Sequence, residues 1–202
     1  MIKKYAILGG SFNPVHNGHL EMARCSKEQF GLDEIIFMPN KTTYYKETKV
    51  FASDEHRLNM LRLATKPYSY MSVSDMEIKR GGVTHTIDTI REFHNESSDD
   101  RVNFIIGGDS LQWLDKWVEA QELLRLTTFI AAIRDDVDTE SAKGIIAQIK
   151  DEYPDSDIRL LNMKSMSVSS SDIRSRIKTG DSIEGLVPEY VEKYIYDNKC
   201  YS

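Results

Sequence analysis

Two histidines three positions apart, His16 and His19, stand where a helix is expected to begin, just after the turn residues Gly9, Gly10 and Ser11. Side chains at this spacing lie on one side of the first helical turn. The start of a helix offers free backbone N–H groups and the positive end of the helix dipole. A phosphate bound there would meet amide, hydroxyl and imidazole donors together. Two other interpretations stay open: a metal half-site that lacks an obvious third ligand, and residues that only cap and pack the helix.

A second group of candidate phosphate ligands lies near the other end of the chain. Ser169 and Ser170 precede a helical segment that Gly180 is expected to terminate, and Arg174 follows Ser170 by four positions. With this spacing the serine hydroxyls, the helix start and the guanidinium can face one phosphate from the same side. The alternative is a serine that caps the helix and an ordinary surface arginine.

A third candidate group follows a central apolar run that leads into Gly107 and Asp109. Glycine lets a ligand lie against the backbone, and a carboxylate at a strand end can accept two ribose hydroxyls. The alternative is a turn in which Asp109 caps a short helix over residues 110–114. Trp113 and Trp117 are four positions apart, so they are expected as neighbours on a helix, and tryptophans at such spacing usually belong to the core.

Two further loops are expected near these groups. Residues 81–86 form a loop that leads into a helix, where N–H groups could bind a carboxylate or serve only as a cap. Residues 40–52 have no clear hydrophobic period and are expected to form a longer loop after a strand. That position at the carboxyl end of a strand brings Lys46 within range of the two histidines.

The elements that must position these residues are strands alternating with helices. Apolar runs rich in β-formers occur at residues 5–8, 34–38, 70–74, 102–106, 128–133 and 158–161. Helices are expected to begin near Asp54, Thr86, Ser141 and Pro188. The alternation predicts an α/β fold: a Rossmann-like, doubly wound parallel sheet with helices on both faces. We expect a single domain over residues 1–202, with a C-terminal helical part at about residues 170–202.

Composition and charge restrict the function classes. The chain has 202 residues and a formal net charge of -6, so it lacks the basic excess of general nucleic-acid-binding proteins. No stretch approaches the roughly 18 apolar residues of a membrane span. Neither G-x-G-x-x-G nor G-x-x-x-x-G-K-[ST] occurs, which disfavours a dinucleotide dehydrogenase and a P-loop NTPase. We expect a cytoplasmic protein without nucleic-acid or membrane partners, and the sequence leaves a homo-oligomer open.

Together these segments resemble the nucleotidyltransferase superfamily marked by H-x-G-H, and within it the bacterial nicotinate-nucleotide adenylyltransferases. Residues 9–19 satisfy the pattern G-G-[ST]-F-[DN]-P-x-H-x-G-H throughout, and residues 107–109 match G-x-D. Residues 168–174 match [IV]-S-S-[ST]-x-I-R. The resemblance runs almost end to end, and it includes Met38-Pro39, Trp117, Arg134 and Val187-Pro188.

The resemblance implies that ATP and nicotinate mononucleotide react to give deamido-NAD and pyrophosphate, with Mg²⁺ held mainly by the ATP phosphates and no dedicated protein metal site. The catalytic residues implied are His16, His19, Lys46 and Arg174. The ATP-binding residues implied are Gly9, Gly10, Ser11, Phe12, Gly18, Gly107, Asp109, Arg134, Ser169 and Ser170. The residues implied for the mononucleotide are Thr84, His85, Trp117 and Val118.

The chain departs from the family pattern at three places. The usual Pro-Pro-His-Lys is Thr43-Tyr44-Tyr45-Lys46, the usual Ser-Tyr-Thr is Thr84-His85-Thr86, and Val118 replaces an aromatic residue. The alternatives are a related adenylyltransferase that acts on nicotinamide mononucleotide or phosphopantetheine, and a nucleotide-binding module without turnover.

Overall fold

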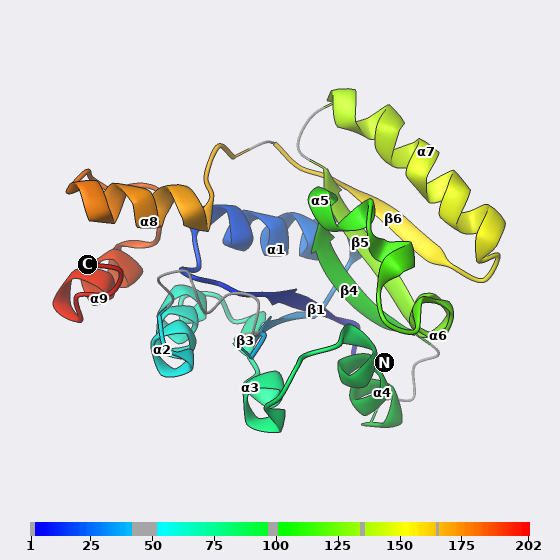
Figure 1. Cartoon of the computed structure of the whole chain (residues 1–202), viewed down its shortest axis with the longest axis horizontal. Coiled ribbons are helices and arrows are strands. Elements are labelled where there is room, and N and C mark those ends of the chain that lie inside the picture. Colours follow the sequence, from blue (N-terminus) through cyan, green and yellow to red (C-terminus); the bar gives the residue numbers. More distant parts are fainter. Residues whose placement is uncertain (1–2, 42–51, 97–100, 134–135, 165) are drawn as a thin grey trace.

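The computed structural model describes residues 3–41, 52–96, 101–133, 136–164 and 166–202. Each of the six apolar runs predicted from the sequence forms a strand, and the strands pair in parallel in the order β3-β2-β1-β4-β5-β6 (Figure 1). The strands are β1 (Tyr5–Gly10), β2 (Glu34–Pro39), β3 (Met71–Val73), β4 (Val102–Gly107), β5 (Thr127–Ile133) and β6 (Asp157–Asn162). Every residue of β5 is buried, which explains its continuous apolar sequence.

The strand order reverses between β1 and β4. From β1 the chain crosses to β2 and β3 on one side, whereas from β4 it proceeds to β5 and β6 on the other side. In open α/β sheets, ligands bind outside the carboxyl ends of the strands at such a reversal. Because β1 ends at Gly10 and β4 ends at Gly107, two of the segments singled out from the sequence open at this point.

The helices in the described part of the chain cover both faces of the sheet. They are α1 (Asn17–Phe30), α2 (Asp54–Thr65), α3 (Met76–Arg80), α4 (Thr86–Glu96), α5 (Gly108–Leu111), α6 (Ala120–Leu126), α7 (Asp136–Glu152), α8 (Ser170–Thr179) and α9 (Glu189–Asp197), with a 3-10 helix, η2, at Leu114–Lys116. None of these helices is long and apolar enough to cross a lipid bilayer.

Alternate residues of β1 belong to different hydrophobic clusters. Ala6 and Leu8 pack in the cluster that includes side chains of α1, α2, α8 and α9. Ile7 packs in the cluster that includes side chains of α4, α6 and α7. Figure 1 shows α8 and α9 at one end of the molecule, near α2, and α7 at the other end. The prediction of a doubly wound parallel sheet with helices on both faces is therefore confirmed.

The predicted helix starts are correct near Asp54, Thr86 and Pro188 and wrong near Ser141. The first helix after the long loop does begin at Asp54, but Ser53 caps it by accepting a hydrogen bond from the His56 N–H at 3.2 Å. The helix predicted to begin near Ser141 is α7, which begins at Asp136. Pro188 is the N-cap residue of α9, as its fixed backbone angle favours.

The two tryptophans do not share a helix. The helix predicted over residues 110–114 is α5, which ends at Leu111 and has Gly107 as its N-cap residue, so Asp109 is not the cap. Trp113 and Trp117 instead flank η2 at its two ends. Trp113 is 60% exposed and does not belong to the core, whereas Trp117 packs against Phe129. The break in the helix therefore sends the two rings to different environments.

Candidate active site

The two histidines lie at the start of α1 as the sequence predicted. His16 is the N-cap residue in an extended conformation, and its N–H donates to Nδ1 of His19 at 3.2 Å. This places a histidine ring where a capping box usually has Glu or Gln. Because Nδ1 of His19 accepts a hydrogen bond, the neutral ring carries its proton on Nε2. The capping bond therefore fixes the tautomer of the neutral His19 ring.

The imidazole rings of His16 and His19 are stacked, with centroids 3.6 Å apart and planes 25° apart. On its other side His19 meets the ring of Phe12 edge-on at 4.9 Å between centroids. Phe12 is buried, contacts Phe37, and has a left-handed backbone with a φ of 44°. The Phe12 side chain thus supports His19 from the core and does not reach the cavity described below.

Glycine allows close approaches in this turn. A Cβ atom on Gly9 would lie 2.6 Å from Cζ of Phe104, a separation that real side chains do not tolerate. A Cβ atom on Gly18 would lie 3.1 Å from both Nδ1 of His16 and Cγ1 of Val168. Gly18 therefore lets the His16 ring and the segment before α8 converge on the start of α1.

Sequence reasoning missed a buried arginine that holds the turn after β1 in place. The side chain of Arg57 is 0% exposed, and its guanidinium donates to the carbonyl oxygens of Ser11 at 2.7 Å and Asn40 at 2.8 Å. It also donates to Oδ1 of Asp54 at 2.6 Å, and Lys41 pairs with Oδ2 of the same carboxylate at 2.5 Å. Arg57 thus joins the ends of β1 and β2 and fixes which way the Ser11 peptide faces.

The pKa of the Asp54 carboxyl is held below its ordinary value. Partial burial, the largest single influence, acts in the opposite direction, but the hydrogen bonds and charges of Lys41 and Arg57 together outweigh it. The Asp54 carboxylate is therefore ionised in the folded protein near neutral pH.

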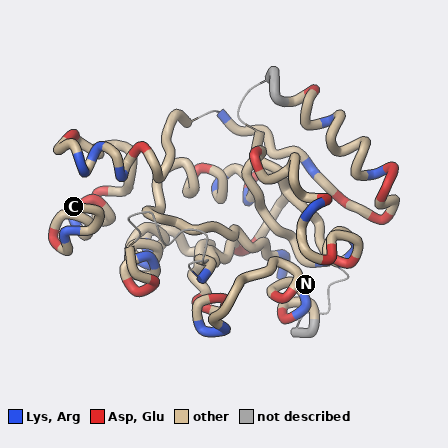
Figure 2. Tube along the Cα trace, in the orientation of Figure 1, with Lys and Arg blue, Asp and Glu red and all other residues tan. Residues whose placement is uncertain are grey.

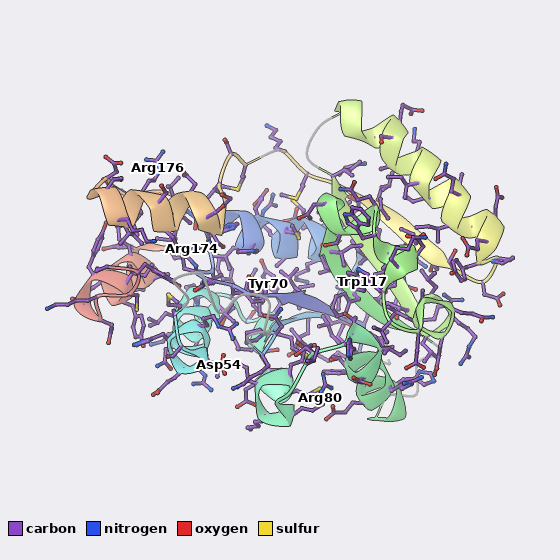
Figure 3. The ribbon with its side chains drawn as sticks, in the orientation of Figure 1. Asp54, Tyr70, Arg80, Trp117, Arg174 and Arg176 are labelled. Carbon is purple, nitrogen blue, oxygen red and sulfur yellow. The ribbon has the colours of Figure 1, made fainter. Side chains whose placement is uncertain are left out.

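The start of α8 reaches the same turn. Ser169 caps α8 by accepting from the N–H of Asp172 at 3.1 Å, and Ser170 donates to the carbonyl of Pro14 at 2.8 Å. Arg174 donates to the carbonyl of Asn13 at 2.7 Å. In Figure 3, Arg174 lies on the side of α8 nearer the sheet and Arg176 on the opposite side. The predicted end of this helix is confirmed, because Gly180 adopts the left-handed conformation after Thr179.

The carboxyl end of β4 contributes Gly107 and Asp109. A Cβ atom on Gly107 would lie 2.6 Å from Oδ1 of Asp109, so only glycine leaves room for the carboxylate where it lies. Trp117 lies nearby, with its ring edge-on to Phe129 at 6.1 Å between centroids (Figure 3). Oγ1 of Thr84 is buried and has no hydrogen-bond partner among the residues that the structure describes. The hydrogen-bonding capacity of this hydroxyl is therefore unused within the described residues.

These groups surround one cavity of about 540 Å³, a size typical of small-molecule sites. The predicted site residues on its wall are Gly9, Gly10, Ser11, His16, Gly18, His19, Thr84, Gly107, Asp109, Trp117, Ser169 and Ser170. Phe12, His85, Val118 and Arg174 are not on the wall, and Val118 is 46% exposed. The predicted residues Lys46 and Arg134 lie outside the described residues.

Sequence reasoning missed several wall residues, namely Met22, Asn40, Glu77, Met163 and Met166. Met22 follows His19 by three positions on α1, so the helical period could have identified it. Glu77 gave no such signal. Glu77 as a whole is 4% exposed, its carboxylate accepts a hydrogen bond from Thr89 at 2.6 Å, and burial raises the pKa of that carboxyl.

The charge around the cavity comes from individual side chains. It does not come from a broad basic face of the molecule. Lys and Arg are interspersed with Asp and Glu along the chain (Figure 2). Among the residues described, no group of three or more His, Cys, Asp or Glu side chains is placed to hold a metal ion.

Comparison with known proteins shows the family of the chain. Residues 7–176 match the family described as cytidylyltransferase-like. The chain is 40% identical over 200 residues to a "probable nicotinate-nucleotide adenylyltransferase" of Lachnoclostridium phytofermentans, covering 99% of this chain and 100% of that protein. It is 37% identical over 201 residues to the protein of the same description from Dehalococcoides mccartyi, covering 98% and 97%. The chain belongs to the nicotinate-nucleotide adenylyltransferase family.

Solved structures show that this family fold is shared with distant relatives. The nicotinic acid mononucleotide adenylyltransferase of Plasmodium falciparum complexed with NaAD superimposes with a TM-score of 0.80 at 21% identity, covering 98% of this chain and 97% of that one. The same protein complexed with APC gives a TM-score of 0.77 at 20% identity, with the same coverage. At this identity the likeness shows the fold.

Proposed function

We propose that this protein transfers the adenylyl group of ATP to nicotinate mononucleotide, forming deamido-NAD and pyrophosphate for NAD biosynthesis. One observation carries the proposal. The stacked histidines at the start of α1 share a single cavity with Asp109 at the end of β4 and with Thr84 and Trp117. A nucleoside triphosphate and a second nucleotide can therefore lie in one continuous space.

The reaction needs little proton transfer. A phosphate oxygen of the mononucleotide attacks the α-phosphorus of ATP, and the bond from that phosphorus to the α–β bridging oxygen breaks. Pyrophosphate leaves with the electron pair. Because the attacking phosphate is already ionised near neutral pH, the protein must mainly align two anions and stabilise charge on the α-phosphate and the leaving group.

We assign the donors at the start of α1 to the ATP phosphates. Nε2–H of His19, together with His16, would contact the α-phosphate as charge builds there, with the amides around Gly10 beside them. Ser169 and Ser170 at the start of α8, with Arg174, are assigned to the β and γ groups. Lys46 keeps the catalytic role and Arg134 the ATP-binding role that the family resemblance implies.

Mg²⁺ is proposed to enter with ATP. The described residues offer no cluster of three ligands, which fits an ion held mainly by phosphate oxygens. Bound in this way, the ion would neutralise phosphate charge.

The opposite end of the cavity is assigned to the pyridine nucleotide. The Thr84 hydroxyl and the amides of Thr84, His85 and Val118 would recognise the nicotinate carboxylate, and Trp117 would lie beside the ring. Nicotinate and nicotinamide differ by a full charge, so a site built from N–H and O–H donors favours the acid. Asp109 and Gly107 are assigned to a ribose.

The test is an acceptor assay. The full chain is incubated with ATP, Mg²⁺ and, in turn, nicotinate mononucleotide, nicotinamide mononucleotide or phosphopantetheine, and released pyrophosphate is measured. Release with nicotinate mononucleotide well above the other two is the expected result. Faster release with another acceptor would replace the proposed substrate, and tight ATP binding without release for any acceptor would indicate a non-catalytic module.

The histidine roles have their own variants. His16→Ala and His19→Ala should each lower turnover on the order of 100-fold or more, because each removes a donor to the charged transition state. His56→Ala is the matched control, since His56 bonds Tyr194 between α2 and α9 and does not line the cavity. Near-normal turnover in the His16 variant would overturn the mechanism.

The remaining expectations concern assembly and location. A reaction that consumes ATP fits a cytoplasmic protein whose partners are its two nucleotides, and the net charge of -6 offers no general attraction for nucleic acid. A homo-oligomer stays a proposal, which light scattering of the purified chain measures directly.

A further inference from the structure

A buried hydrogen-bond network joins α3 to α4 behind the pyridine end of the cavity. Thr89 of α4 is fully buried, and its hydroxyl donates to Oε1 of Glu77 in α3 at 2.6 Å. The same hydroxyl oxygen accepts from Nη2 of Arg80 at 2.8 Å, and Nη1 of Arg80 pairs with Glu92 at 3.1 Å. Figure 3 shows Arg80 at the end of α3 that faces α4. One hydroxyl therefore links both helices.

The residues between these helices form a short segment, 81–85, that carries a wall residue of the cavity. Gly81 and Gly82 both have φ values of 70°, which glycine adopts without strain. Thr84 follows them and lines the cavity, as Glu77 does. The buried Thr84 hydroxyl has no partner among the described residues, so no hydrogen bond of its own fixes its position. The position of that hydroxyl depends on how α3 and α4 are held together.

We propose that Thr89 is a positioning residue: through Glu77 and Arg80 it sets the geometry of residues 81–85, and so the affinity for the acceptor mononucleotide. The inference rests on the function proposed above, because it concerns the acceptor end of that site. Thr89 is not on the cavity wall and acts only through its neighbours.

Loss of the Thr89 hydroxyl has a specific consequence. Glu77 would keep a buried carboxyl without its hydrogen-bond donor, and Nη2 of Arg80 would lose its acceptor while Nη1 keeps its pair with Glu92. An unsatisfied buried polar group is costly, so α3 and α4 would shift until water or another group reached it. The donors assigned to the ATP phosphates within the described residues lie at the end of β1 and at the starts of α1 and α8, and none of these elements contributes a residue to this network. The effect should therefore fall on the acceptor and not on ATP.

The experiment compares steady-state constants of full-length variants. Thr89→Val keeps the size of the side chain and removes the hydroxyl, and we expect it to raise KM for nicotinate mononucleotide about tenfold with KM for ATP changed less than about twofold. Thr89→Ser restores a hydroxyl and should return the acceptor KM to near the wild-type value. Thr65→Val is the matched control, because it removes a buried hydroxyl that bonds Leu61 within α2.

A second pair of variants avoids the buried position. Arg80→Met removes the bond to Thr89 from a partly exposed side chain and should raise the acceptor KM by a smaller factor. Lys79→Met, its control on the same helix, removes only a surface pair with Asp75 and should leave both constants unchanged. This pair remains informative if Thr89→Val does not fold.

The outcomes separate the two proposals. Wild-type protein that releases no pyrophosphate with nicotinate mononucleotide overturns the proposed function. Wild-type activity combined with an unchanged acceptor KM in Thr89→Val and Arg80→Met overturns the positioning role alone. Equal increases in both KM values, or an acceptor KM in Thr65→Val that matches Thr89→Val, would show general destabilisation and would also overturn it.

Discussion

Replacing the buried Arg57 by methionine should strongly destabilise the protein. Methionine fills much of the same space but cannot donate to the Ser11 and Asn40 carbonyls or pair with Asp54. Hydrogen bonds to a charged group contribute about 1.5–3 kcal/mol each. Removing one partner of a buried ion pair costs about 3–5 kcal/mol. These contributions overlap, and Lys41 still pairs with Asp54 in the variant. We therefore expect the free energy of unfolding to fall by about 3–5 kcal/mol. This is a large part of the roughly 5–15 kcal/mol that stabilises a typical domain.

The measurement is urea unfolding followed by circular dichroism. Arg62→Met is the control, since Arg62 lies on the same helix, is exposed, and makes only a 3.4 Å bond to Asn59. That variant should lie within about 0.5 kcal/mol of the wild type. If Arg57→Met were within about 1 kcal/mol of Arg62→Met, the role given to the buried guanidinium would be wrong. The same variant should raise KM for ATP, because the Ser11 peptide loses its anchor.

Gly9→Ala should cost about 1–3 kcal/mol in unfolding free energy, because the new methyl group meets the Phe104 ring. Gly144→Ala, in the open middle of α7, should instead stabilise the protein by about 0.5–1 kcal/mol. Urea unfolding measures both variants, and a change of the same sign in both would contradict the clash predicted between residue 9 and Phe104. Since the pKa of Asp54 is lowered in the folded state, its contribution to stability is present above the unfolded value of about 3.9 and is lost as pH falls through the folded value. The stability difference between wild type and Asp54→Asn, followed by urea unfolding, should therefore shrink on acidification below about pH 5, and a constant difference would refute this linkage.

The sequence predicted what local pattern controls. Strands buried on both faces need unbroken apolar runs, and the six runs became the six strands of the sheet. Histidines three positions apart at a helix start must lie near each other, and His16 and His19 are stacked. The end of α8 followed from Gly180, because only a residue tolerant of positive φ suits that position.

The sequence could not predict what distant contacts decide. Arg57 looks like a surface residue of an amphipathic helix, and nothing local indicates that Ser11, 46 positions away, supplies a buried acceptor. The four-residue spacing of Trp113 and Trp117 predicted a shared helix, but the chain breaks after α5 and η2 separates the rings. Glu77 was missed for the same reason as Arg57, since its partner Thr89 lies on another helix.

The contacts of α8 also bear on when the site can exist during synthesis. Ser170 and Arg174 bond to Pro14 and Asn13, partners 156 and 161 positions earlier in the chain. A ribosome adds about 5–20 residues per second, so the histidine turn emerges many seconds before the helix that completes it. All six strands precede α8, so a nascent chain can assemble the whole sheet before Ser170 and Arg174 are present. A nascent chain that ends before residue 170 therefore lacks the two hydrogen bonds by which α8 holds the histidine turn, although its sheet can already be complete.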